Sequence, residues 1–223
     1  MTEGTGFLYP FIDAEERDSG PLLVDLAASA RQKARESSAL QQSTLADCAD
    51  TVAAAGAEMA ERFAAGGRLY VFGNGGSSTD AATFAALFAQ PVAGRPLAAV
   101  NLASDQAVLT ALGNDVGFEL VFSRQLIAHA TNRDIAVAFS TSGNSADLLT
   151  ALQEAADRGL LTIGFAGYTG GEMADSPAVH HCFVVHSQSI HRIQESQALL
   201  GYHLWLRTQQ CLDSSSAASG GNR

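Results

Sequence analysis

The feature that most constrains the fold of this chain is a short apolar run that leads into a glycine-rich turn and then into a helix pattern. Residues 69–72, Leu-Tyr-Val-Phe, have the length and composition of a buried strand. The turn Gly73-Asn74-Gly75-Gly76 follows directly, and its glycines let the backbone approach a ligand closely. Ser77, with Asp80 three residues later, is typical of a capping box, so we expect a helix to begin there. Because the backbone N–H groups at a helix start are unpaired and partly positive, this turn favours an anion, most often phosphate.

The same plan recurs at residues 134–159. An apolar run over 135–139 precedes the turn Ser140-Thr141-Ser142-Gly143-Asn144-Ser145, which carries four hydroxyl groups. An amphipathic helix pattern follows, which Asn144 or Ser145 can cap and Gly159 ends. A turn that is rich in Ser and Thr only for capping is the structural alternative. One cap needs fewer hydroxyls, so we interpret this turn as a second anion-binding element.

Strand and helix patterns alternate through the rest of the chain. Further strand runs occupy residues 97–102, 160–165 and 182–185, with helix patterns over 105–112 and 118–130. Five strands that are mostly separated by helices predict an α/β fold, a doubly wound five-stranded parallel sheet with helices on both faces. Such sheets bind ligands at the carboxyl ends of their strands, near the switch in strand order. Both turns follow the carboxyl end of a predicted strand.

Two helix patterns precede the first strand. One runs from Pro21 to Leu40, and a Thr-x-x-Asp cap at Thr44 and Asp47 predicts the start of another that ends at Gly66. Both lie outside the alternating core. Their apolar stripes favour burial against a second subunit.

The chain is predicted to hold one domain with two flanking segments. That domain covers residues 21–212 and closes with a helix over 190–212. Residues 1–20 form an N-terminal arm, whose apolar run at 7–12 favours a subunit contact. Residues 213–223 are small and polar, so we expect a disordered tail.

Charge and cysteine content exclude several function classes. Thirteen Lys and Arg against twenty-three Asp and Glu give a net charge of −10, which argues against broad contact with nucleic acid. Three cysteines without CxxC spacing fit reduced thiols better than a disulfide framework or a structural zinc site. The sequence shows no uncharged apolar run of 18 residues and no signal-peptide pattern, so we expect a soluble, cytoplasmic protein without membrane contact.

Four motifs together resemble those of the sedoheptulose-7-phosphate isomerase (phosphoheptose isomerase) family of SIS-domain, or sugar isomerase, proteins. In chain order they are Gly73-Asn74-Gly75-Gly76-Ser77, Gly113-Asn114-Asp115-Val116-Gly117-Phe118, Ser140-Thr141-Ser142-Gly143-Asn144-Ser145 and Arg192-Ile193-Gln194-Glu195. The resemblance covers nearly the whole chain outside its two ends. It implies a SIS fold of the flavodoxin-like type, a phosphorylated sugar as ligand and a homotetramer.

The resemblance also implies which residues bind the substrate. The phosphate would be held by Ser140, Thr141, Ser142 and Ser145. The sugar side of the pocket comes from the other three motifs, with Asn74, Gly75, Gly76, Ser77, Asn114, Asp115 and Gln194. Hydroxyl and N–H groups donate several hydrogen bonds to phosphate, so no lysine is required there.

Three positions depart from the family's pattern. In the family, a His and a Glu one helical turn apart follow the first motif, and a second His lies eight residues beyond the Gln of the fourth. With that Gln they can hold zinc, and the Glu and the second His serve as acid and base. Here these positions are Thr83, Leu87 and Tyr202, and only Gln194 remains. We therefore expect no metal and no other cofactor.

His191, Glu195 and His203 are the remaining candidates for acid–base catalysis. His191 and Glu195 flank Gln194 at i and i+4 and could pair. His203 directly follows Tyr202. Because one residue turns a helix by about 100°, its side chain would point away from the place that the Tyr202 position faces. Two functions stay open, a phosphosugar isomerase with displaced catalytic groups and weak or absent activity, and a non-catalytic phosphosugar-sensing or protein-interaction protein. The DnaA initiator-associating protein, a relative of the family, is an example of the second.

Overall fold

The computed structural model describes residues 20–220 of the chain, with side chains up to residue 215. The predicted apolar arm contact at 7–12 lies outside these residues. The chain divides into two compact units, one ending at Ala39 and the other beginning at Leu40. This boundary falls inside the first helix, α1 (Gly20–Asp47).

Helix α1 is longer than the sequence pattern predicted. It continues without a break to Asp47, so the helix start predicted at Thr44 is wrong. Residues 40–44 contain no Gly or Pro that would end a helix, and Thr44 is buried within α1 instead of capping a new one. In the first unit, Leu22, Leu23, Val24 and Leu26 are each about half exposed or more.

The second helix, α2 (Ala49–Ala64), starts after a turn at Cys48. It ends where predicted, because Gly67 N–H donates to the carbonyl of Arg62 (2.9 Å) and Gly66 N–H to that of Phe63 (3.0 Å). These two bonds satisfy carbonyl groups of the last turn and deliver the chain to the first strand.

Five parallel strands form one sheet in the order β2-β1-β3-β4-β5, as the alternating pattern predicted. The order switches direction at β1, which lies between β2 and β3. Strands β1, β3 and β4 are buried along their whole length, which matches their apolar runs, interrupted only by Thr162 in β4. The strands are β1 (Leu69–Gly73), β2 (Ala99–Asn101), β3 (Ile135–Phe139), β4 (Leu161–Gly167) and β5 (His181–Val185).

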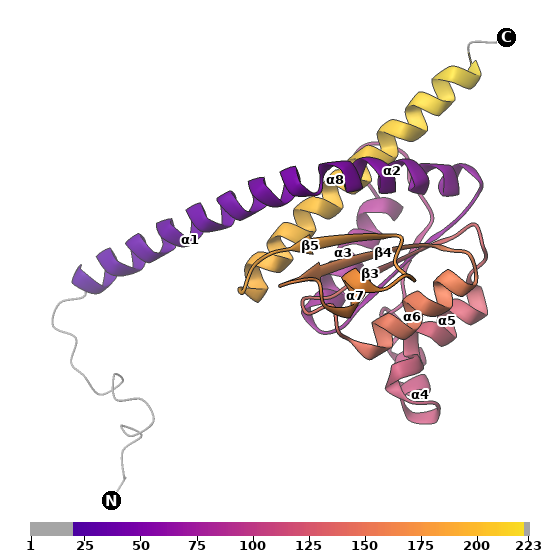
Figure 1. Cartoon of the computed structure of the whole chain (residues 1–223), viewed down its shortest axis with the longest axis horizontal. Coiled ribbons are helices and arrows are strands. Elements are labelled where there is room, and N and C mark those ends of the chain that lie inside the picture. The colour runs from indigo at the N-terminus through magenta and orange to yellow at the C-terminus, as the bar shows by residue number, and fades with distance from the viewer. Residues whose placement is uncertain (1–19, 221–223) are drawn as a thin grey trace, which may run out of the picture. The chain divides into compact units, whose positions relative to one another are not determined.

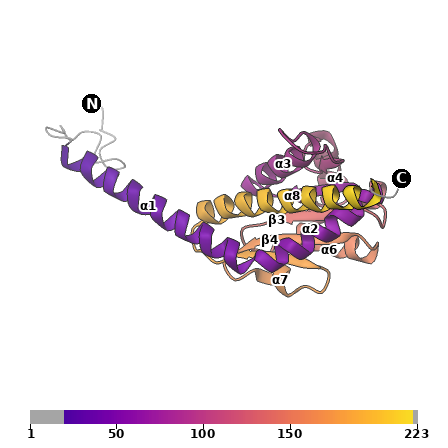
Figure 2. The same ribbon diagram turned by 90° about the horizontal axis from the view of Figure 1, so that it is seen from above.

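Helices cover both faces of this sheet. The side chains of α2, α3 and α8 share one apolar core with the strands, and those of α5, α6 and α7 share the other. Figure 1 shows α2 and α8 on one side of the strands with α5 and α6 on the other, and Figure 2 gives the same layers from above. The remaining helices are α3 (Gly76–Ala89), α4 (Gln106–Asp115), the 3₁₀ turn η2 (Phe118–Leu120), α5 (Val121–His129), α6 (Ala146–Asp157), α7 (Gly171–Asp175) and α8 (Ile190–Gly220).

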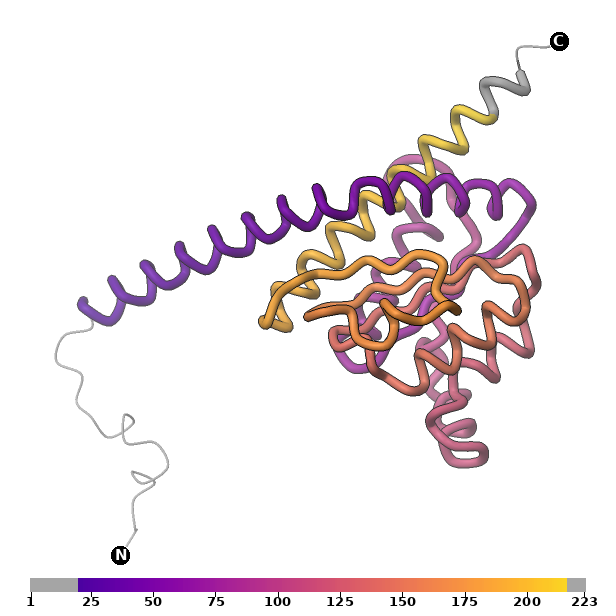
Figure 3. The backbone as a smooth tube through the Cα atoms, viewed as in Figure 1, coloured from indigo at the N-terminus to yellow at the C-terminus, as the bar shows by residue number. Residues whose placement is uncertain are grey.

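The carboxyl-terminal ends of two helices, α4 and α8, differ from the prediction. The helix predicted over 105–112 continues through the expected turn to Asp115. Helix α8 passes Leu212 (Figure 3) and runs to Gly220, so the tail predicted as disordered from residue 213 is helical up to 220. Ser214 and Ser215 each donate a hydroxyl hydrogen bond to the carbonyl four residues earlier, which is how Ser is accommodated in a helix.

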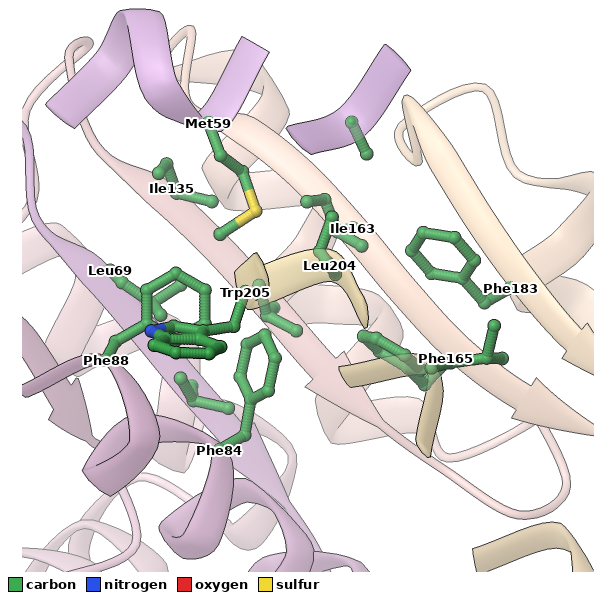
Figure 4. Close-up of a cluster of buried hydrophobic side chains, with 14 of the residues drawn as sticks. Met59, Leu69, Phe84, Phe88, Ile135, Ile163, Phe165, Phe183, Leu204 and Trp205 are labelled. Atoms are coloured by element: carbon green, nitrogen blue, oxygen red, sulfur yellow. The ribbon is translucent and has the colours of Figure 1, made fainter. Parts of the chain in front are cut away.

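Aromatic ring pairs anchor α3 to the sheet, and Figure 4 shows Phe84 and Phe165 within this core. Phe139 and Phe165 stack with ring centroids 4.4 Å apart, and Phe84 of α3 meets the Phe139 ring at 5.4 Å. Such pairs stabilise a core beyond the area they bury. Because Phe139 is the last residue of β3, this cluster holds the start of the hydroxyl-rich turn in place.

No helix in the described part of the chain is long and apolar enough to cross a membrane.

Candidate functional site

The two predicted anion-binding turns lie side by side. Strands β1 and β3 are parallel neighbours with Gly73 opposite Phe139, so both turns leave the same edge of the sheet next to the switch in strand order. Between them is a cavity of about 110 Å³. Its lining residues are Asn74, Ser77, Phe139, Ser140, Thr141, Ser142, Ser145 and Leu148.

The first turn starts helix α3 without a side-chain cap. The helix begins at Gly76, so its N-cap is Gly75, which makes no side-chain cap hydrogen bond. The predicted capping box of Ser77 and Asp80 is therefore wrong, because both residues already lie inside the helix. Ser77 is buried and lines the cavity instead.

The second turn uses two of its hydroxyls to hold its own backbone. Ser140 Oγ accepts a hydrogen bond from Gly143 N–H (2.9 Å), and Ser142 Oγ accepts one from Asn144 N–H (3.2 Å). Ser145 occupies the N-cap position of α6 but makes no side-chain cap hydrogen bond. Its hydroxyl is thus left for the cavity that it lines.

Asn144 binds the neighbouring loop and not α6, contrary to the prediction that it could cap that helix. Its Oδ1 accepts a hydrogen bond from Glu172 N–H (2.8 Å) at the start of α7. The short helix α7 thereby supports the turn from outside.

Asp147 orients the side chain of Asn74, a contact that the sequence did not reveal. Asn74 Nδ2 donates to both carboxylate oxygens of Asp147, at 3.0 and 2.8 Å. Asp147 is 5% exposed and lies in the first turn of α6, where the helix dipole favours a negative charge. The sequence shows an acidic residue in the first turn of a predicted helix, but it does not show that the partner of this residue lies 73 residues away.

The cavity suits an anion through neutral donors. No Lys or Arg lines it, and the available donors are hydroxyl groups together with the backbone N–H groups at the starts of α3 and α6. Both helices direct the positive ends of their dipoles to the edge of the sheet where the cavity lies. A phosphate group matches these donors.

A second, smaller cavity of about 80 Å³ lies between α3 and α8. The three departing positions, Thr83, Leu87 and Tyr202, all line it. Its other lining residues are Asp80, Phe84, Phe139, Gln197, Ala198 and Gly201. Phe139 lines both cavities, so the two adjoin at the end of β3.

Gln194 connects α8 to the start of α3. Its Nε2 donates to Asp80 Oδ2 (2.7 Å), and a Cβ atom added at Gly76 would lie 2.8 Å from the same nitrogen. Burial raises the pKa of the Asp80 carboxyl, and the hydrogen bond from Gln194 opposes that shift.

The second cavity does not fit a zinc ion of the kind the resemblance implies. Leu87 has no ligand atom, and the Thr83 hydroxyl donates to the carbonyl of Thr79 (3.0 Å). Between residues 20 and 220, no three or more His, Cys, Asp and Glu side chains are grouped so that they could hold a metal.

Eight of the predicted site residues lie outside the lining of both cavities. Three of these eight lie close to the cavities, because Gly75 and Gly76 start α3 and Gln194 of α8 lies against Gly76. His191 and Glu195 are exposed on the first turns of α8. His203 faces a different groove, where it lies with Ala49, Val52 and Ala53 at the start of α2. Asn114 and Asp115 are exposed at the end of α4, where Asn114 Nδ2 donates to Asp115 Oδ1 (2.9 Å).

Comparison with known proteins gives consistent matches. The SIS domain family model matches residues 34–167. A phosphoheptose isomerase of Aquifex aeolicus is 43% identical over 141 residues, which cover 62% of this chain and 73% of that protein. The phosphoheptose isomerase of Solidesulfovibrio magneticus is 40% identical over 171 residues, which cover 76% of this chain and 82% of that protein. Among solved structures, phosphoheptose isomerase GmhA from Neisseria gonorrhoeae aligns with a TM-score of 0.76 at 33% identity, over 85% of this chain and 99% of that one.

Proposed function

Because the chain belongs to the SIS domain family and is similar to phosphoheptose isomerases over most of its length, we propose that it binds a phosphorylated sugar. The observation that carries this proposal is the cavity between the two turns, which four hydroxyl groups of residues 140–145 and the start of α3 surround without any basic side chain. Sedoheptulose 7-phosphate is the first ligand to test, since the similar proteins are named phosphoheptose isomerases.

In the proposed complex, the phosphate accepts hydrogen bonds from hydroxyl groups and from backbone N–H groups of the two turns. Ser145 contributes a hydroxyl that has no capping role, and Ser140 and Ser142 hold the backbone that presents the other donors. Donor groups fixed before the ligand arrives lose little freedom on binding. Neutral donors at helix starts therefore suffice for a dianionic ligand.

Calorimetric titration with sedoheptulose 7-phosphate and with unphosphorylated sedoheptulose tests the proposal. A charge-assisted hydrogen bond contributes roughly 1.5–3 kcal/mol, so Ser145→Ala should weaken binding of the phosphorylated sugar about tenfold or more. The melting temperature of the Ser145→Ala variant should stay near that of the wild type, because Ser145 makes no capping hydrogen bond that the change would remove. Ser214→Ala, an exposed change far along α8, is the matched control. Equal binding of both sugars would refute the proposal.

We further propose that isomerase activity is weak or absent and insensitive to chelators. The second cavity carries Thr83, Leu87 and Tyr202 where the resemblance implies metal and acid–base groups. Loss of a positioned general base lowers a rate by roughly 10²–10⁴. This cavity also favours the second candidate function, a phosphosugar-sensing or protein-interaction role without catalysis.

An isomerisation assay of the purified, metal-analysed protein on sedoheptulose 7-phosphate separates these outcomes. We expect little or no turnover, with or without a chelator. Robust turnover that a chelator abolishes would contradict the proposal, and robust turnover that survives the chelator but is lost in His191→Ala would show displaced acid–base catalysis.

The proposed assembly is a homotetramer in the cytoplasm, without direct binding of nucleic acid. The exposed apolar residues of α1 support self-association, because isolated helices with several exposed leucines favour a partner surface.

A further inference from the structure

The second cavity has one acidic side chain among uncharged residues. Of the residues that line it, only Asp80 carries a charge, and Phe84, Leu87 and Phe139 give it apolar walls. No Lys, Arg or His in the described part of the chain pairs with Asp80. Burial raises the pKa of this carboxyl, and the hydrogen bond from Gln194 offsets only part of that shift. The carboxylate is therefore left without a cationic partner in apolar surroundings.

One oxygen of Asp80 is free to bind a ligand group. Oδ2 accepts the hydrogen bond from Gln194 (2.7 Å), whereas Oδ1 bonds to no described residue. Oδ1 is accessible to solvent, unlike the unpaired Oε1 of Gln197 in the same cavity. The cavity itself is open, because its lining includes the exposed residues Thr83 and Tyr202. A group that enters the cavity can therefore reach the Asp80 carboxylate.

The proposed phosphate site lies one helical turn away from this carboxylate. Ser77 lines the first cavity and Asp80 lines the second, three residues further along α3, which is about 4.5 Å at 1.5 Å per residue. Phe139 lines both cavities. The starts of α3 and α6 favour an anion in the first cavity, and the carboxylate favours a cation in the second. A ligand that spans both cavities is best matched by a phosphate at one end and a positive charge at the other.

The second cavity fits a small ammonium group. At about 30 Å³ per water in the liquid, a volume of about 80 Å³ holds an amine nitrogen together with the carbon that bears it. A guanidinium group is larger than this volume allows. Tyr202 also lines the cavity, and aromatic rings attract cations. A hydroxyl group also donates to a carboxylate, but only a cation offsets the repulsion between that carboxylate and a bound phosphate.

We propose that Asp80 binds a protonated primary amine, so that the pocket takes amino-sugar phosphates in preference to sugar phosphates with a hydroxyl group at the same place. The inference rests on the proposed function and narrows it, because it requires an amine at the end of the sugar opposite the phosphate. Oδ1 accepts a charge-assisted hydrogen bond from the ammonium, while Oδ2 keeps its bond with Gln194. An N-acetylated amine has no charge, so it gains nothing from Asp80.

The test compares D-glucosamine 6-phosphate with D-glucose 6-phosphate, which differ only in an amine or a hydroxyl group at carbon 2. By calorimetry on the full chain at neutral pH, the amine should bind at least about tenfold more tightly to the wild type. In Asp80→Asn, which keeps an acceptor for Gln194 but has no charge, the two ligands should bind alike. N-acetyl-D-glucosamine 6-phosphate should bind the wild type no more tightly than D-glucose 6-phosphate. The ratio of affinities is the readout, because a general change of the pocket would affect all three ligands together.

A control variant and a pH series give independent readouts. Asp50→Asn makes the same chemical change at an exposed position of α2 outside both cavities, so it should leave the ratio unchanged. In the wild type, the ratio should fall towards one as pH rises through the pKa of the ligand's own amine, because the neutral amine has no charge to pair with Asp80. D-glucose 6-phosphate has no amine and serves as the reference at each pH.

The outcomes separate this inference from the function on which it rests. Equal binding of phosphorylated and unphosphorylated forms of both sedoheptulose and D-glucosamine overturns the proposed function. Binding that needs the phosphate but shows no preference for the amine overturns only the role of Asp80, and so does binding of sedoheptulose 7-phosphate without binding of either hexose phosphate. A preference that persists in Asp80→Asn, is lost in Asp50→Asn or does not change with pH overturns that role too.

Discussion

Replacing Gly143 with alanine is the sharpest test of how the hydroxyl-rich turn is built. Gly143 has a φ of +72°, in the left-handed region that side chains rarely adopt, and its N–H donates to Ser140 Oγ. A Cβ atom at this position would lie 1.9 Å from the carbonyl oxygen of Gly170. The turn and the loop before α7 therefore approach each other through two glycines.

The cost of Gly143→Ala has two parts, and Gly159→Ala measures one of them alone. Gly159 has a similar φ of +78°, but its added Cβ would only touch Asn132 at an ordinary 3.5 Å. The left-handed conformation costs a non-glycine residue about 1–2 kcal/mol. Reduced freedom of the unfolded chain offsets about 0.4–1 kcal/mol of this. Gly159→Ala should therefore lower the free energy of unfolding by about 1 kcal/mol.

Gly143→Ala adds a clash that only backbone movement can relieve. The carbonyl of Gly170 must retreat by about 1.5 Å to reach ordinary contact. That movement stretches two hydrogen bonds between turn and loop, Met173 N–H to Gly143 O (2.9 Å) and Glu172 N–H to Asn144 Oδ1 (2.8 Å). Each contributes about 1 kcal/mol. The total loss should be about 3 kcal/mol or more.

Urea unfolding of both variants gives the two losses, and calorimetry with sedoheptulose 7-phosphate gives the effect on binding. We expect Gly143→Ala to lose about 2 kcal/mol more stability than Gly159→Ala and to bind at least tenfold more weakly. Equal losses in the free energy of unfolding of the two variants would refute the reasoning, because the clash with Gly170 would then have no effect on stability.

Three further predictions concern a carboxyl, a thiol and the assembly. Burial raises the pKa of Asp80, so the folded state keeps this proton to higher pH than the unfolded chain does, and stability falls as pH rises from about 3.9 through the folded pKa. Asp80→Asn should remove this contribution to the pH dependence of the free energy of unfolding, measured by urea unfolding at several pH values. The variant should be at least as stable as the wild type at neutral pH. An unchanged pH dependence would contradict this prediction. Burial, with Cys48 and Asp175 nearby, raises the pKa of the Cys182 thiol to about 12, so mass spectrometry should find it unmodified by iodoacetamide in the folded protein and alkylated in urea. Light scattering at micromolar concentration should give about four times the chain mass of 23.2 kDa, and a monomer mass would rule out the proposed homotetramer.

The sheet was predictable because each buried strand carries its own signal. Runs such as 69–72 and 135–139 are apolar throughout, and glycine or hydroxyl residues mark where each strand ends. Helix ends were less predictable. The Thr44 and Ser77 capping patterns are both present in the sequence, yet each lies inside a helix. A cap pattern does not by itself end the helix before it, so α1 continues through Thr44, whereas α3 starts one residue before Ser77, with Gly75 as its N-cap.

The cavity between the turns was predictable for the same reason as the sheet. Parallel neighbours with polar turns at their carboxyl ends must bring those turns together, which is what places Ser140 and Ser145 beside Asn74. The contacts of Asp147 with Asn74 and of Gln197 with Ser140 were not predictable. They join residues far apart in the chain, and Asp147 and Gln197 occupy positions in α6 and α8 that the sequence does not distinguish from those of other helix residues.

The proposed binding groups and the positions expected to serve catalysis lie on different elements. The proposed phosphate-binding groups belong to turns that follow strands, whereas the positions where the resemblance implies metal and acid–base groups lie on the facing sides of α3 and α8. Substitutions at Thr83, Leu87 and Tyr202 change only the second cavity, because none of them contributes to the turns. Gln194 has a role there without a metal, since its hydrogen bond to Asp80 ties α8 to the first turns of α3. The residue that the resemblance implies as a zinc ligand thus ties together the two helices on either side of the second cavity.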